Sequence, residues 1–216
     1  MKKLFLVLAL TVLLLIPVSS AHIPELVLED RNYTLEPFVV KDPEISYAYY
    51  GKLQGSPHQY KIVSEKPFRL YVSLLAPYVG QEETSDVEFH IMKGGEKIVM
   101  MHGYENWTKW YEEYGGDWYL QGPEYEDDVE AGVYLVEVHS ETNSEDYVVA
   151  IGKTERFGSL EILQTIIVLP LMKAIFWDSY TMVGAYILVP VLIIILVFVA
   201  RRRPGKQAKR RKRKRT

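Results

Sequence analysis

An uncharged stretch near the C-terminus constrains this chain more than any other feature of its 216 residues. Residues 180–200 carry no charged side chain, and Arg201, Arg202 and Arg203 follow directly. About twenty apolar residues cross a bilayer core of roughly 30 Å, and Lys and Arg beside a span stay on the cytoplasmic side. The sequence therefore predicts one transmembrane helix at 180–200 and a basic cytoplasmic tail at 201–216.

The N-terminus favours the same topology. Lys2 and Lys3 precede an apolar run that ends near Pro17, and small residues follow up to Ala21. This order is typical of a secretory signal peptide, which we expect to occupy 1–21 and to be cleaved after Ala21. The alternative is an uncleaved first membrane helix, although the run is short for a span. We therefore expect a plasma-membrane protein with its N-terminal domain outside.

Charge is divided sharply along the chain. All 28 acidic residues lie between positions 22 and 179, where 12 basic residues leave the region at −16, and 11 basic residues follow position 200. An acidic outer region argues against nucleic-acid binding, which needs a basic face. The basic tail beside a span favours contact with anionic lipid. The chain has no cysteine, which excludes thiol catalysis and Cys-ligated zinc and suggests a prokaryotic source.

The outer region reads as short strands separated by turns. Phe68, Leu70, Val72 and Leu74 alternate with polar or half-polar positions, which is the period of a half-buried strand. Similar alternation recurs at 45–53, 59–63, 87–92, 97–101, 132–138 and 146–152, and Gly94-Gly95 marks a hairpin turn. No long amphipathic helix separates these segments. We expect an all-β ectodomain built as an antiparallel β-sandwich or jelly roll over 45–158.

Four of these strand segments resemble the bacterial pre-peptidase C-terminal domain. They read Ser-Pro-His-Gln-Tyr-Lys-Ile at 56–62, Phe-Arg-Leu-Tyr-Val at 68–72, Gly-Val-Tyr-Leu-Val-Glu-Val at 132–138 and Asp-Tyr-Val-Val-Ala-Ile-Gly at 146–152. The resemblance covers about residues 45–152, and the aromatic insertion at 104–119 departs from it. It implies an accessory or binding sandwich of secreted and surface proteins, with no catalytic residues to transfer.

Two further segments flank the expected sandwich. Residues 22–44 contain Pro24 and Pro37 and read as an extended lead-in. Residues 159–179 are rich in Leu and Ile, contain Pro170 and Lys173, and read as an amphipathic segment at the outer membrane surface. A first span of a re-entrant pair is the alternative.

Aromatic residues are concentrated in one stretch, and they provide the candidate binding site. Three of the four Trp residues lie between 104 and 119, and aromatic rings stack on sugars and supply contact area at interfaces. If this stretch is helical, spacings of three and four residues would align several rings, as in a core-facing stripe. The two alternatives for this stretch are a buried plug of the sandwich and an exposed recognition surface. The candidate residues are Trp107, Trp110, Tyr111, Tyr114, Trp118 and Tyr119.

Other polar groups give weaker signals. The acidic residues Glu124, Glu126, Asp127 and Asp128 could bind calcium, but their order does not match an EF-hand, and a solvated turn is the alternative. The five His residues form no HExxH motif or tight metal-binding pair in the sequence. Asn32 and Asn106 each begin a glycosylation sequon. Apart from calcium, we expect no cofactor.

These features predict a single-pass membrane-anchored surface protein with a non-catalytic binding or structural sandwich outside. Membrane lipid and a surface polysaccharide or envelope protein are the expected partners. One alternative is an accessory subunit of a membrane complex, because Gly184 and Ala185 allow close helix approach. A hydrolase with an unrecognised site is another, since catalytic groups assemble across the sequence.

Overall fold

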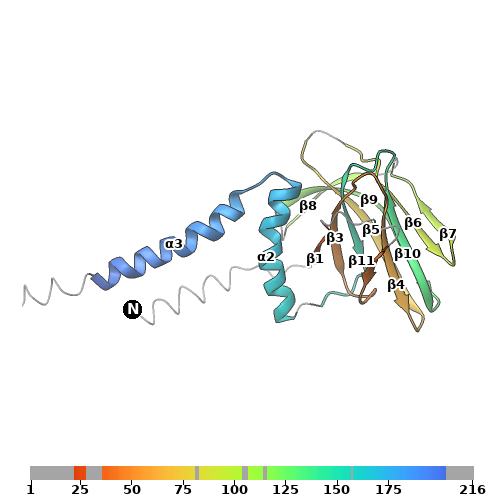
Figure 1. Ribbon diagram of the computed structural model, residues 1–216, viewed down its shortest axis with the longest axis horizontal. Coiled ribbons are helices and arrows are strands. Elements are labelled where there is room, and N and C mark those ends of the chain that lie inside the picture. The colour runs from red at the N-terminus through yellow and green to blue at the C-terminus, as the bar shows by residue number, and fades with distance from the viewer. Residues whose placement is uncertain are drawn as a thin grey trace, which may run out of the picture.

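The computed structural model describes residues 22–27, 36–80, 83–103, 107–113, 116–156 and 158–202. Within these residues, two β-sheets pack face to face and two helices follow them (Figure 1). The expected β-sandwich is confirmed. Its core contains apolar side chains from both inner faces, with Leu70, Ile91 and Val136 fully buried.

The first sheet has six strands in the order β1-β3-β11-β5-β9-β8. The second has five, in the order β2-β4-β10-β6-β7. The bounds in the first sheet are β1 Ile23–Val27, β3 Tyr47–Lys52, β5 Phe68–Pro77, β8 Thr108–Glu112, β9 Asp117–Val129 and β11 Asp146–Ile151. Those in the second sheet are β2 Phe38–Val40, β4 His58–Ser64, β6 Glu88–Lys93, β7 Glu96–Met101 and β10 Gly132–His139.

The segment expected to be an extended lead-in supplies two edge strands. Strand β1 pairs with β3 and strand β2 pairs with β4, and both pairings are parallel. The remaining pairings are antiparallel. The expectation of purely antiparallel sheets is therefore wrong at the two edges, because strands separated by a long connection can pair in parallel.

The hairpin predicted at Gly94-Gly95 is present between β6 and β7. Both glycines have positive φ, 62° and 88°. Two consecutive residues with positive φ match a type I′ turn, whose twist suits a two-residue β-hairpin.

Helix α2 (Ser159–Phe176) lies against the first sheet, and helix α3 (Thr181–Arg202) leads away from the sandwich (Figure 1). Among the described residues, no helix was identified as long and apolar enough to be a membrane span. The span expected at 180–200 stays a prediction from the sequence. The signal peptide expected at 1–21 and most of the basic tail lie outside the described residues.

Candidate binding cleft and surface histidine cluster

One side of helix α2 is fixed to the outer face of the first sheet. Met172 and Phe176 are 3% and 2% exposed and pack in a cluster with Tyr50, Tyr119 and other residues of that face. The Lys173 ammonium lies 2.8 Å from the Asp117 carboxylate, and both side chains are almost fully covered. The segment expected to lie at a membrane surface is thus also a packed layer of the domain.

The opposite side of α2 exposes large apolar side chains. Leu160 and Ile167 are 78% and 59% exposed, in a helix of 18 residues. Soluble helices usually carry polar groups on the side that faces away from the core. Here the uncovered apolar residues run along the helix: Leu160, Ile162, Leu163, Ile166, Ile167, Leu171 and Ile175.

A cleft of about 470 Å³ lies between α2 and the first sheet. Its lining combines aromatic rings with acidic, basic and hydroxyl side chains: Tyr71, Trp110, Glu112, Tyr119, Lys153 and Thr165. The Tyr50 and Tyr119 hydroxyls lie 2.9 Å apart, and burial raises the pKa of Tyr119 well above its usual value. These phenols therefore stay neutral, and the cleft offers aromatic faces beside hydrogen-bonding groups.

The described part of the aromatic stretch forms strand β8 and the beginning of strand β9 rather than a helix. Strands β8 and β9 pair so that Trp110 lies opposite Tyr119 and Tyr111 lies opposite Trp118. Since neighbouring residues of a strand point to opposite faces, the two pairs lie on opposite faces of the sheet. Trp110 and Tyr119 line the cleft, whereas the Tyr111 and Trp118 rings pack against each other with centroids 4.9 Å apart.

The predicted binding residues accordingly have different surroundings. Trp110, Tyr111 and Trp118 are 39%, 43% and 45% exposed. Trp107 is buried and belongs to the core, where its ring covers Gly122, and Tyr119 is buried beneath α2. Tyr114 and the sequon residues Asn32 and Asn106 lie outside the described residues.

The predicted calcium ligands lie on strand β9 rather than in a turn. Glu126 lies 3.1 Å from Arg69 and 3.0 Å from Lys153, and a second nitrogen of Arg69 lies 3.2 Å from Asp128. Asp127 accepts a hydrogen bond from the Asp128 amide. Glu124 accepts one from the Tyr71 hydroxyl. Part of the acidic run therefore pairs with basic side chains, including Arg69 on the neighbouring strand. A calcium site there stays a prediction.

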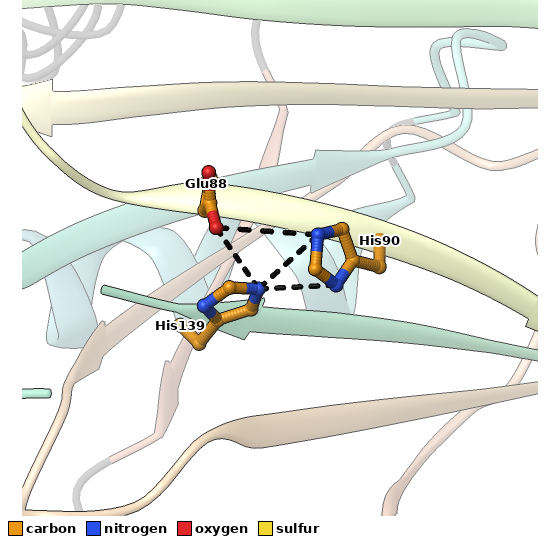
Figure 2. A group of neighbouring side chains, drawn as sticks. All are labelled: Glu88, His90 and His139. Carbon is orange, nitrogen blue, oxygen red and sulfur yellow. Dashed lines mark hydrogen bonds and ion pairs between the residues drawn. The ribbon is translucent and has the colours of Figure 1, made fainter. Parts of the chain in front are cut away.

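The structure assembles a cluster that the sequence reading missed, on the outer face of the second sheet (Figure 2). Glu88 and His90 come from β6, and His139 ends β10. The His139 Nε2 atom lies 3.4 Å from Glu88 Oε1 and 3.4 Å from His90 Nε2, and the last two atoms are 4.0 Å apart. Burial lowers the pKa of His90, and His139 and Lys97 lower it further, so its imidazole is neutral.

A repeated tripeptide is the signal that could have revealed this cluster. Glu-Phe-His at 88–90 and Glu-Val-His at 137–139 both place an acid and a histidine on one face of a strand. The pairing of β6 with β10 sets His139 opposite Glu88 and Glu137 opposite His90. The separation of 49 positions between the two histidines hid this proximity.

Comparison with known proteins gives a limited result. No protein-family model matches the chain, and no curated protein matches it. The chain is similar to the pre-peptidase C-terminal domain of collagenase from Bacillus anthracis, at 9% identity and a TM-score of 0.33, covering 62% of this chain and 97% of that one. It is also similar to a β-glucosidase from Paenibacillus barengoltzii, at 12% identity and a TM-score of 0.28. That match covers 62% of this chain and 13% of the glucosidase.

The first of these structures belongs to the family to which the strand motifs point. At such TM-scores the likeness adds nothing to the sandwich that the two sheets themselves show, and it carries no argument about function.

Proposed function

We propose that this protein is a membrane-anchored, non-catalytic binding domain that helix α2 holds against the outer surface of the bilayer. The observation that carries the proposal is the two-sided packing of α2. One side is fixed to the sandwich by Lys173, Met172 and Phe176, while the other exposes a row of Leu and Ile side chains. A lipid surface would cover that apolar row, as it does for helices that lie in the interface.

The sequence supports the anchor and its direction. The uncharged residues 180–200 are followed by Arg201, Arg202 and Arg203, which favours an outer sandwich and an inner tail. Helix α3 spans this segment directly after α2.

The absence of cysteine from the sequence makes the topology directly testable. Single cysteines can be introduced at the exposed Glu96 and at Thr216, and intact cells treated with a membrane-impermeant maleimide. We expect Glu96→Cys to be labelled in intact cells and Thr216→Cys only after lysis. Labelling of both variants only after lysis would contradict the outside location of the sandwich.

We further propose that the cleft beneath α2 is the binding site and that its ligand is a polysaccharide. Trp110 offers a partly exposed ring, and the polar side chains of Glu112 and Lys153 line the same cleft. Sugars are bound by such combinations of a stacking ring and polar partners. The test is retention of the full-length protein on a panel of surface glycans.

Replacing Trp110 by Ala should abolish retention on any glycan that the wild type binds. Trp118→Ala provides the matched control, because Trp118 is similarly exposed but is not part of the cleft lining. Equal loss in both variants would show that the hairpin as a whole, and not the cleft, binds the glycan.

A second candidate function is that of an accessory subunit in a membrane complex. It is favoured by Gly184 in α3, where an added Cβ would meet no atom within 4 Å, so that a partner helix could approach closely. Co-purification of a stoichiometric partner in mild detergent, lost in Gly184→Leu, would support this function over glycan binding.

A further inference from the structure

We propose that Glu88, His90 and His139 form a Zn²⁺ site on the outer face of the second sheet (Figure 2). Zinc binds His nitrogen and carboxylate oxygen at about 2.0–2.2 Å in tetrahedral geometry, so two ligand atoms stand roughly 3.3 Å apart. His90 Nε2, His139 Nε2 and Glu88 Oε1 are separated by 3.4, 3.4 and 4.0 Å, and His139 Nε2 also lies 3.1 Å from His90 Nδ1. One ion fits between them with small side-chain movements.

The strands hold these ligands on a rigid frame. Phe89 and Val138 point into the core and are fully buried, which fixes the neighbouring Glu88, His90 and His139 on the outer face. Strands β6 and β10 are adjacent in the sheet and pair over six residues, of which His139 and Glu88 form the last pair. Ligands placed on paired strands lose little conformational freedom when a metal binds.

Neighbouring side chains are placed to orient the ligands. His102 Nδ1 lies 3.0 Å from Glu88 Oε2, so the other carboxylate oxygen, Oε1, is left for the metal. Glu137 Oε1 lies 4.0 Å from His90 Nδ1, and Gln59 holds that carboxylate with a 2.8 Å hydrogen bond. A carboxylate behind a histidine is a common arrangement in zinc sites, because it fixes which nitrogen faces the metal.

Lys97 is the group that opposes metal binding. Its ammonium lies 2.7 Å from His90 Nδ1, on the side of the ring where Glu137 stands. Lys97 is exposed, so its flexible side chain can move into solvent and leave Nδ1 to Glu137. Removing this positive charge should therefore strengthen binding, which is the opposite of what loss of a ligand does.

The donor set favours zinc over calcium. Calcium takes six to eight oxygen ligands, whereas imidazole suits zinc. Three protein ligands leave the fourth tetrahedral position for water or for a group from a binding partner. This site lies on the second sheet, across the sandwich from the cleft beneath α2, so it is independent of the proposed glycan site (Figure 1).

The test is metal binding by the full-length protein, purified in detergent with a tag that contains no histidine. Zinc content, Zn²⁺ titration calorimetry and the Co²⁺ absorption spectrum are measured for the wild type and four variants. We expect one Zn²⁺ per chain and a tetrahedral Co²⁺ spectrum in the wild type. His139→Ala and the isosteric Glu88→Gln should each lose the spectrum, with affinity reduced at least about 100-fold.

The two remaining variants separate a zinc site from general loss of structure. Glu137→Gln should weaken binding about 10- to 100-fold, and Lys97→Ala should tighten it. The melting temperature without metal should be nearly the same in His139→Ala and the wild type, since His139 lies at the end of β10. The proposal is overturned if the wild type binds less than one equivalent at micromolar Zn²⁺, or if His139→Ala and Glu88→Gln bind as well as the wild type.

Discussion

Tyr147 is at the centre of a buried polar group between the two sheets. Its hydroxyl lies 2.7 Å from His58 Nδ1 and 2.6 Å from the Tyr60 hydroxyl, and all three residues are almost fully buried. Buried polar groups of this kind are stable only when they are hydrogen-bonded. The tyrosine ring also lies directly over Gly51 of the adjacent strand β3, so this position requires the absence of a side chain.

We predict that Gly51→Ala destabilises the protein by about 1–3 kcal/mol, the usual cost of overpacking a core. An added Cβ would stand 2.5 Å from the Tyr147 ring, and moving the ring would break its hydrogen bonds to His58 and Tyr60. Urea unfolding of the full-length protein measures the change. Gly184→Ala is the control and should be nearly neutral, since its Cβ would meet no atom within 4 Å.

His58 predicts a dependence of stability on pH. Burial lowers its pKa from 6.5 to about 4, so between these values the unfolded chain binds a proton that the folded chain does not. The contribution of neutral His58 to the free energy of unfolding is therefore complete above about pH 6.5. It falls as the pH decreases toward 4, by at most about 3 kcal/mol. His58→Gln should lose less free energy of unfolding between pH 7 and pH 4 than the wild type. Identical pH profiles would contradict a neutral buried His58.

At the scale of elements, the attachment of α2 to the sandwich depends on one covered ion pair. Lys173 and Asp117 are 11% and 12% exposed in their side chains and lie 2.8 Å apart. Removing one partner leaves the other charge uncompensated in a poorly solvated place. The apolar contacts of Met172 and Phe176, and the hydrogen bonds from Gln164 to Pro24 and from Trp177 to Trp118, then hold the helix.

We predict that Lys173→Met destabilises the full-length protein by about 3 kcal/mol, whereas the double variant Lys173→Met, Asp117→Leu recovers most of this loss. Thermal unfolding of the two variants and of Asp117→Leu completes a double-mutant cycle. Equal melting temperatures for all of them would mean that the ion pair contributes nothing to helix attachment.

Much of the fold could be predicted from local patterns, because alternation of apolar and polar residues is a local signal. It predicted β5, β6, β7, β10 and β11 close to their observed bounds. It failed for β8, where aromatic residues stand on both faces and spacings of three and four residues suggested a helical stripe. The histidine cluster could not be predicted from spacing alone, because it depends on which strands become neighbours.

At the scale of the whole molecule, residues 22–179 carry a net charge of −16. Such an excess destabilises a compact state through repulsion between like charges, and salt screens that repulsion. The pairing of Glu126 and Asp128 with Arg69 relieves only a small part of it.

We predict that raising NaCl from low to physiological concentration stabilises the protein by about 1 kcal/mol, or roughly 2–4 °C in melting temperature. A variant with Glu65→Lys and Glu141→Lys, two exposed positions, reduces the excess by four charges and should gain less from salt. A larger gain in this variant would indicate that salt acts on something other than net repulsion. Differential scanning calorimetry of both proteins provides the comparison.

The layers of the molecule also set the distance between the uncovered side of α2 and the histidine cluster. Helix α2, the first sheet and the second sheet follow one another in that order (Figure 1). With sheets about 10 Å apart and a helix about 10 Å thick, the histidine cluster stands roughly 20–25 Å from the uncovered side of α2. If that side rests on lipid, whatever meets the histidines has to approach within about one domain thickness of the membrane. A partner that lies close to the membrane, within a surface layer thicker than the domain, could reach the histidines directly. A soluble partner would first have to cross that layer.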